Sequence, residues 1–197
     1  MPNNDLFFEH LGQSLETFQL AAEHLEELVH HGADLLTDSL LNDGKVLVCG
    51  MGTSAANGQG FATRMISRFE RERPGLPVLA LSGDGLLLTG ISHDTNPNEV
   101  FARQVRTLGN EGDVLLAISS TGNAPPVIKA VQAAHESGLF VLALTGQTGG
   151  DLATLLEEND VELRVPADKV GLIQLTHHLL LNSLGELVEQ QLFGSEL

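Results

Sequence analysis

The sequence predicts an α/β fold in which a parallel sheet is covered by helices on both faces. Short apolar runs alternate with longer segments of helical periodicity along most of the chain. These runs are continuously apolar, which is typical of strands buried on both faces. The chain has 197 residues, of which 42% are hydrophobic and 18% charged. This composition excludes a disordered chain, and the length suits a single domain over residues 1–197.

The chain is predicted to divide into N-terminal helices over residues 1–43 and a parallel α/β core over residues 45–193. Apolar residues recur at helical spacing over 6–22 and again over 25–41, which we interpret as two helices. Gly44 follows the last periodic residue, so it is the expected left-handed cap of the second helix.

Strands and helices then alternate through the core. The predicted strands, of which the last is half-polar and therefore an edge strand, are 45–49, 78–81, 113–118, 139–144 and 161–165. The predicted helices are 55–70, 98–108, 125–137, 149–156 and 171–193.

The final predicted helix is more apolar than a helix with one exposed face. Leucines recur on several of its faces, from Leu172 to Leu187. Such a helix is either central in the monomer or part of a subunit interface. Because the N-terminal helices also need a surface to cover, we favour an oligomer.

Charge and cysteine content exclude several classes of protein. The formal net charge is −16, which repels phosphate backbones and argues against direct nucleic-acid binding. Cys49 is the only cysteine, so no internal disulfide or multi-cysteine metal site is possible. The first residues lack the positive region of a secretory signal, and no apolar run is long enough for a membrane span. We therefore expect a cytoplasmic protein.

Two predicted strands end in loops suited to binding an anion. Residues 50–55 read Gly-Met-Gly-Thr-Ser-Ala, and residues 119–123 read Ser-Ser-Thr-Gly-Asn. Ligands bind beyond the carboxyl ends of parallel strands, where helix N-termini favour anions and hydroxyls add donors. The lysine of a nucleotide P-loop is absent, so the loops suit a phosphate monoester better than a triphosphate. Ordinary helix capping is the alternative explanation for their Ser and Thr residues.

These loops, together with residues 68–74 and 112–119, resemble the SIS (sugar isomerase) domain family. The resemblance is to the branch that contains phosphoheptose isomerases and the DiaA type, which associates with the replication initiator DnaA. It implies a flavodoxin-like three-layer sandwich around a five-stranded parallel sheet. It also implies a homotetramer with ligand sites between subunits.

The resemblance further implies a set of phosphosugar-binding residues. In the family, the phosphate is held by a serine of the first loop and by a run of Ser and Thr residues in the second loop. In this chain Ala124 replaces one hydroxyl residue of that run. An aspartate after the second strand and a glutamine on the last helix complete the set. The matching residues here are Gly52, Thr53, Ser54, Asp94, Ser119, Ser120, Thr121, Asn123 and Gln174.

The family's catalytic and zinc-binding positions are not retained. In the isomerases a glutamate and a histidine act as base and acid, and a second histidine and the glutamine complete a zinc site. Gly60 replaces the zinc-binding histidine, Arg64 the glutamate and Asn182 the last-helix histidine, so that only Gln174 remains. Since glycine offers no ligand and arginine stays protonated, we expect no catalytic residues, metal or cofactor. Two roles for Arg64 stay open. Its guanidinium pairs with a phosphate or a carboxylate at the ligand site, or it forms a solvated salt bridge with an acidic residue at the surface.

Three hypotheses follow from this pattern. The first is a non-catalytic DiaA-like protein that binds DnaA, with Leu192 and Phe193 at the C-terminal end as candidate partner contacts. The same pair is explained equally well by a helix end docked on its own subunit. The second is a phosphoheptose or related phosphosugar isomerase working through other residues. His93 beside Asp94 is a candidate pair for this, although an exposed loop histidine is expected more often. The third is a phosphosugar sensor.

Overall fold

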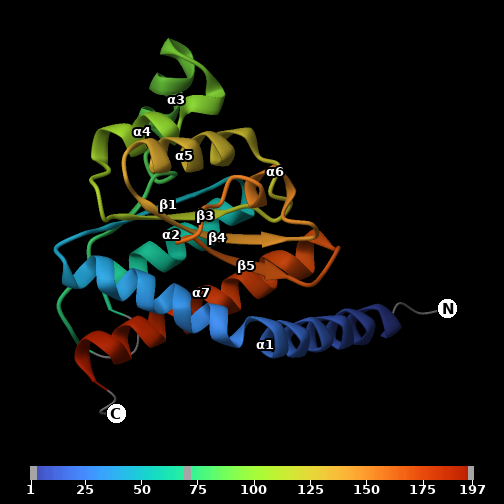
Figure 1. Ribbon diagram of the computed structural model, residues 1–197. Coiled ribbons are helices and arrows are strands. Elements are labelled where there is room, and N and C mark those ends of the chain that lie inside the picture. The colour runs from blue at the N-terminus through green and yellow to red at the C-terminus, as the bar shows by residue number, and fades with distance from the viewer. Residues whose placement is uncertain (1–3, 69–71, 195–197) are drawn as a thin grey trace.

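A computed structural model describes residues 4–68 and 72–194, and Figure 1 shows their arrangement. The strands are β1 (Val46–Gly50), β2 (Val78–Ala80), β3 (Val114–Ile118), β4 (Phe140–Gly146) and β5 (Val161–Val165). The helices are α1 (Asn4–Leu41), α2 (Thr53–Ile66), α3 (Gly85–Asp94), α4 (Ala102–Leu108), α5 (Pro125–Glu136), α6 (Gly150–Ala153) and α7 (Val170–Phe193), with a 3-10 turn over Pro97–Glu99.

The five strands form one parallel sheet in the order β2-β1-β3-β4-β5. The chain moves outward from β1 to β2, then returns across β1 to build β3, β4 and β5 on the other side. The strand order therefore reverses between β1 and β3, where open α/β sheets bind their ligands. The expected fold class is confirmed, and β5 is an edge strand as predicted.

Helices cover both faces of the sheet and give a three-layer sandwich (Figure 1). Alternate residues of each strand point to opposite faces, so that Val48 packs with α1, α2 and α7 while Cys49 packs with α4 and α5. Both side chains are almost fully buried. Burial raises the pKa of the Cys49 thiol to about 12, so this cysteine acts as a small core residue.

The N-terminal segment differs from its prediction, because it is one continuous helix, α1, rather than two. The extent of burial changes along this helix. Its second half packs on the sheet and on α7, whereas residues 5–12 are all exposed. The left-handed residue after α1 is Asp43, with φ 60°, and not Gly44. Gly44 is needed for another reason, since a Cβ there would lie 2.7 Å from the Ser39 carbonyl oxygen.

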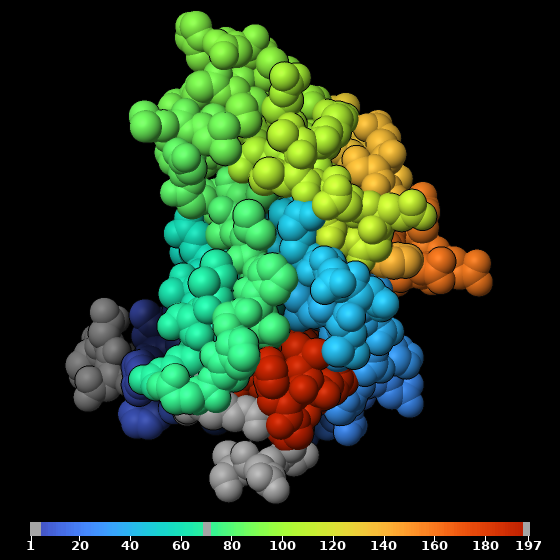
Figure 2. All heavy atoms as spheres, turned by 90° about the vertical axis from the view of Figure 1, so that its left-hand side faces the viewer, coloured from blue at the N-terminus to red at the C-terminus, as the bar shows by residue number. Residues whose placement is uncertain are grey.

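Helix α3 was not predicted from the sequence. It begins after Asp84, whose carboxylate accepts hydrogen bonds from the amides of Leu86 and Leu87. None of its residues is buried, so the burial pattern that marks other helices is missing. Figure 2 shows α3 as the green projection at the top of the molecule.

The last helix, α7, turns one of its two adjacent histidines inward. His177 is fully buried, and its Nε2–H donates to the Thr145 carbonyl at the end of β4 at 2.9 Å. Burial lowers the pKa of His177 to about 4, so the imidazole is neutral at physiological pH. His178 is exposed. No helix among residues 4–68 and 72–194 has the length and apolar character needed to cross a membrane.

Candidate functional site: a hydroxyl cradle at the switch point

The two hydroxyl-bearing loops leave the sheet side by side. Gly50 at the end of β1 is in register with Ile118 at the end of β3. The loops that follow therefore start at neighbouring points on the carboxyl edge, at the switch point of the sheet. We call residues 51–54 and 119–123 the cradle.

The first loop turns tightly into helix α2. Gly52 has φ 58° and ψ −124° and precedes the helix, with no side chain capping its first turn. This conformation strongly favours glycine. Gly50 allows Ser54 to fold back, because a Cβ on Gly50 would lie 2.9 Å from the Ser54 carbonyl carbon. Ser54 is consequently buried at the start of α2, whereas Thr53 is exposed.

The second loop is braced by α6. Gly122 has φ 68°, and a Cβ on it would lie 1.8 Å from the Gly149 carbonyl oxygen. Its own carbonyl accepts a hydrogen bond from the Leu152 amide at 3.0 Å. The Asn123 Oδ1 accepts another from the Asp151 amide, also at 3.0 Å. These two hydrogen bonds tie the loop to α6. The adjacent Gly149–Gly150 pair is the one sequence signal that could have indicated it.

Within this loop the hydroxyl side chains differ in exposure. Ser119 is buried, and Ser120 and Thr121 are half-buried. Thr121 Oγ1 accepts a hydrogen bond from the Asn123 amide at 3.3 Å, and Asn123 itself is exposed. The helix that follows, α5, has no side-chain cap, and prolines occupy its first positions. A helix N-terminus and neighbouring hydroxyls suit a small anion such as a phosphate monoester.

The other two predicted ligand residues differ in their placement. Gln174 is half-buried on α7, and its backbone carbonyl accepts a hydrogen bond from Asn57 Nδ2 at 3.0 Å. Because Asn57 follows Ser54 by less than one helical turn, Gln174 lies beside the cradle end of α2. Asp94 is at the exposed end of α3, where its carboxylate is 2.9 Å from His93 Nδ1. The His93–Asp94 pair is thus fully at the surface.

Gly60, Arg64 and Asn182, where the family resemblance implies catalytic and zinc-binding groups, do not suit a metal ion. No heavy atom lies within 4 Å of a Cβ placed on Gly60, so packing does not force the absence of a side chain there. Arg64 is half-buried, and desolvation lowers the pKa of its guanidinium, which still remains cationic at neutral pH. The Oδ1 of Asn182 is buried without a hydrogen-bond partner among the described residues. A cation, an amide and a glycine form no zinc site.

Within the described ranges 4–68 and 72–194, no three His, Cys, Asp or Glu side chains gather in a way that could hold a metal ion. The far end of α2 is instead fixed by a buried ion pair. Arg73 Nε lies 2.6 Å from Glu189 Oε1 on α7, and the Arg73 guanidinium also donates to the carbonyls of Arg64 and Met65. Sequence reasoning missed this pair.

The candidate partner contacts lie at the end of α7. Leu192 is half-buried against the core, and Phe193 is 39% exposed. Figure 2 shows the end of α7 in red, between the end of α1 in blue and the segment after α2 in green. The pair is therefore partly docked on its own chain and partly available at the surface.

Comparison with known families gives a match to the SIS domain over residues 7–146. The chain belongs to the SIS domain family. This SIS chain is 44% identical to the phosphoheptose isomerase of Chromohalobacter salexigens over 186 residues, which cover 94% of both chains. It is 49% identical to the DnaA initiator-associating protein DiaA of Klebsiella pneumoniae over 181 residues, or 92% of both chains.

Solved structures agree with this assignment. The phosphoheptose isomerase of Neisseria gonorrhoeae superposes with a TM-score of 0.91 at 39% identity, covering 96% of this chain and 100% of that one. The phosphoheptose isomerase of Francisella tularensis gives a TM-score of 0.94 at 36% identity, with the same coverage. The SIS chain therefore shares fold and family with phosphosugar isomerases and with DiaA proteins at similar levels of identity.

Proposed function

We propose that this chain is a non-catalytic SIS protein that binds a phosphosugar in the cradle and associates with the replication initiator DnaA. The observation that carries the proposal is the contrast along α2. The cradle end keeps Ser54, whereas the position of the catalytic base is taken by Arg64. A permanently protonated side chain cannot remove a proton from a sugar carbon.

Association with DnaA is supported by the identity to DiaA proteins and by Phe193 at the surface. In this proposal the protein is a cytoplasmic homotetramer. It presents several copies of the surface around Phe193 to DnaA and does not itself contact DNA. Several copies on one particle raise the effective concentration of bound initiators. The net charge of −16 suits a basic, DNA-binding partner.

The cradle is tested by calorimetric titration with sedoheptulose 7-phosphate and with the sugar lacking phosphate. We expect saturable binding of the phosphate ester alone, reduced at least tenfold in a Ser54→Ala, Ser119→Ala double variant. Thr107→Ala, an exposed hydroxyl on α4, is the matched control. Equal affinity of the double variant and the parent would show that the cradle is not the phosphate site.

The DnaA association is tested by pull-down of purified DnaA at near-physiological salt. Phe193→Ala is expected to weaken saturable capture, and Leu86→Ala, which removes a side chain 86% exposed on α3, is the control. An unrelated acidic protein tests for charge-driven capture. If DnaA binds this SIS chain no more strongly than it binds the unrelated acidic protein, the proposed association with DnaA is wrong.

The alternative function, a phosphoheptose or related phosphosugar isomerase, is favoured by the 44% identity to one such enzyme. Under our proposal the purified protein holds no stoichiometric zinc and does not turn over sedoheptulose 7-phosphate. A combined Gly60→His, Arg64→Glu, Asn182→His variant restores the family's residues and should gain zinc. Turnover by the unmodified protein would establish the alternative.

A further inference from the structure

Arg64 is a cation in a part of the molecule that carries few acidic residues. The chain has a net charge of −16, yet helix α2 contains no Asp or Glu, and Arg64 is its only charged residue. On α7 the first acidic residue is Glu186, near the C-terminal end. The next, Glu189, is already paired with Arg73. These two helices therefore give the surroundings of Arg64 a local potential that attracts an anion.

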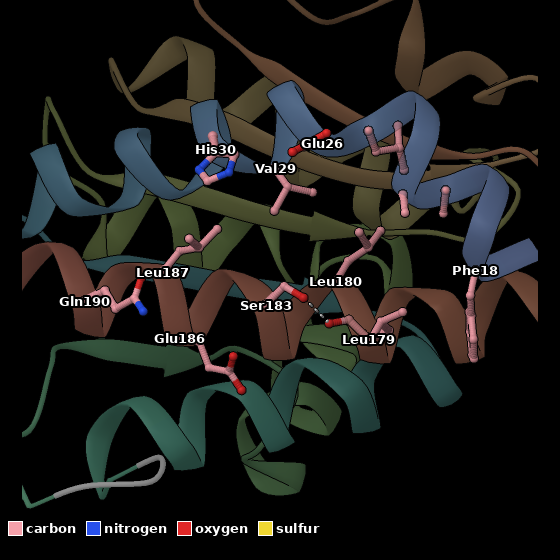
Figure 3. A pocket seen from close by; sticks show the side chains of 13 residues that line it. Phe18, Glu26, Val29, His30, Leu179, Leu180, Ser183, Glu186, Leu187 and Gln190 are labelled. Atoms are coloured by element: carbon pink, nitrogen blue, oxygen red, sulfur yellow. Dashed lines mark hydrogen bonds between the residues drawn. The ribbon is translucent and has the colours of Figure 1, made fainter. Parts of the chain in front are cut away.

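Helices α2 and α7 contact each other and run parallel. Figure 3 shows α7 with α1 on one side and α2 on the other, and α2 ends beside the C-terminal part of α7. Two links hold α2 and α7 together. At one end Asn57 Nδ2 donates to the Gln174 carbonyl. At the other end Arg73 donates to the Met65 carbonyl and pairs with Glu189.

A stripe of half-buried residues without apolar side chains lies between these links. Arg64 follows Asn57 by seven residues, and Asn182 follows Gln174 by eight, so each pair is about two turns apart on the same side of its helix. Gly60 lies between Asn57 and Arg64, and a Cβ on it would meet no atom within 4 Å. All five residues are half-buried. We call them the polar stripe.

Two side chains of the polar stripe present buried polar atoms. The Nε and Nη2 atoms of Arg64 are buried, so water and salt screen an ion pair with this guanidinium less than a pair at the surface. The Oδ1 of Asn182 is buried and accepts no hydrogen bond from the described residues. A buried acceptor of this kind needs a donor, and a sugar hydroxyl is a suitable one.

We propose that the polar stripe binds the carboxylate end of a phosphorylated sugar acid whose phosphate lies in the cradle. Arg64 pairs with the carboxylate, and Asn182 Oδ1 accepts a hydrogen bond from a hydroxyl of the sugar chain. The inference rests on the proposed function and names the chemical class of its ligand. A single guanidinium matches a carboxylate, because its parallel N–H groups donate to both oxygens of that group.

The length of α2 between the cradle and Arg64 agrees with such a ligand. Ser54 and Arg64 are ten residues apart, which is about 15 Å along the helix. Helical side chains lean toward the N-terminus of their helix, which here is the cradle end. An extended arginine side chain crosses about 6 Å at roughly 1.5 Å per bond. The remaining interval of about 9 Å is the span of an open chain of about six carbons with a carboxylate and a phosphate at its ends.

The first test is calorimetric titration with 6-phosphogluconate and with sorbitol 6-phosphate. These open-chain molecules have the same length and differ only at C1, which is a carboxylate in the first and an alcohol in the second. We expect at least tenfold tighter binding of 6-phosphogluconate, and Arg64→Met should remove most of this difference. Arg68→Met removes an exposed arginine four residues later and is the matched control, which should keep the difference. Circular dichroism checks that both variants remain folded.

The second test changes the charge at the other side of the polar stripe. Asn182→Asp keeps the shape of the side chain and places a carboxylate beside that of the ligand, so 6-phosphogluconate should lose at least tenfold more affinity than sorbitol 6-phosphate. Fructose 1,6-bisphosphate is titrated against the unmodified protein to test the kind of anion. Binding as tight as that of 6-phosphogluconate would show that any second anion suffices and would overturn the assignment of a carboxylate.

The outcomes separate this inference from the proposed function. If both six-carbon phosphates bind equally and lose affinity in the Ser54→Ala, Ser119→Ala double variant, the cradle is the phosphate site and the inference alone is wrong. If these two ligands and sedoheptulose 7-phosphate all fail to bind, the phosphosugar site of the proposed function is wrong as well. A preference for 6-phosphogluconate that persists in Arg64→Met would show that Arg64 pairs with an acidic residue of the protein instead, and would overturn the inference.

Discussion

The bracing of the cradle by α6 predicts a large effect of Gly122→Ala. Gly122 has φ 68°, and the left-handed region costs a residue with a side chain about 1–2 kcal/mol. The added Cβ would lie 1.8 Å from the Gly149 oxygen, where van der Waals contact needs roughly 3.5 Å. The two loops must therefore separate, which breaks the bond from the Leu152 amide and costs about 1 kcal/mol more.

We thus expect Gly122→Ala to lower the free energy of unfolding by about 3 kcal/mol and to abolish phosphosugar binding. Gly112→Ala is the control, since Gly112 has φ 87° but a Cβ on it meets no atom within 4 Å. Unfolding in urea is followed by circular dichroism, because the chain has no Trp or Tyr. If Gly122→Ala is no less stable than Gly112→Ala and still binds the ligand, the bracing does not shape the cradle.

Two further predictions concern buried ionisable groups. The pKa of His177 is about 4 in the folded chain and 6.5 in the unfolded one, so folding excludes a proton and stability falls as the pH drops through this interval. The loss attributable to His177 is about 3 kcal/mol, and urea unfolding at pH 7 and pH 4 should show a smaller pH dependence for His177→Gln. Glu189→Ala leaves the buried Arg73 guanidinium without its carboxylate and should lower the free energy of unfolding by about 3 kcal/mol, against a smaller loss for Glu189→Gln. Thermal unfolding that is unchanged in Glu189→Ala would show that the pair has no net stabilising role.

The central strands β1 and β3 could be predicted closely because they are continuously apolar and fully buried. In β3, Val114 to Ile118 have no exposed residue, so the pattern in the sequence is the pattern of burial. Helix α3 gave no such signal. Leu86 and Leu87 are exposed there, and the only sign of its start is the capping carboxylate of Asp84.

The continuity of α1 was missed for a related physical reason. The apolar stripe changes its environment along the helix, from the exposed Leu15 to the buried Leu36. The sequence shows which positions are apolar but not which of them are buried. A change of burial along one helix is therefore easily taken for a break between two helices. The bracing of Asn123 by Asp151 could not be predicted either, because it joins residues 28 positions apart.

The geometry of α2 is compatible with the proposed function, in which a SIS chain keeps a phosphosugar site without the catalytic groups. Ser54 and Arg64 are ten residues apart on one helix, which at 1.5 Å per residue is about 15 Å. The proposed phosphate anchor depends on the helix N-terminus, on Gly50 and on the second loop. None of these depends on the side chain at the far end of α2. Under the proposed function, Arg64 in place of the base removes the proton transfer and leaves the anchor unchanged, so binding and catalysis can be lost independently.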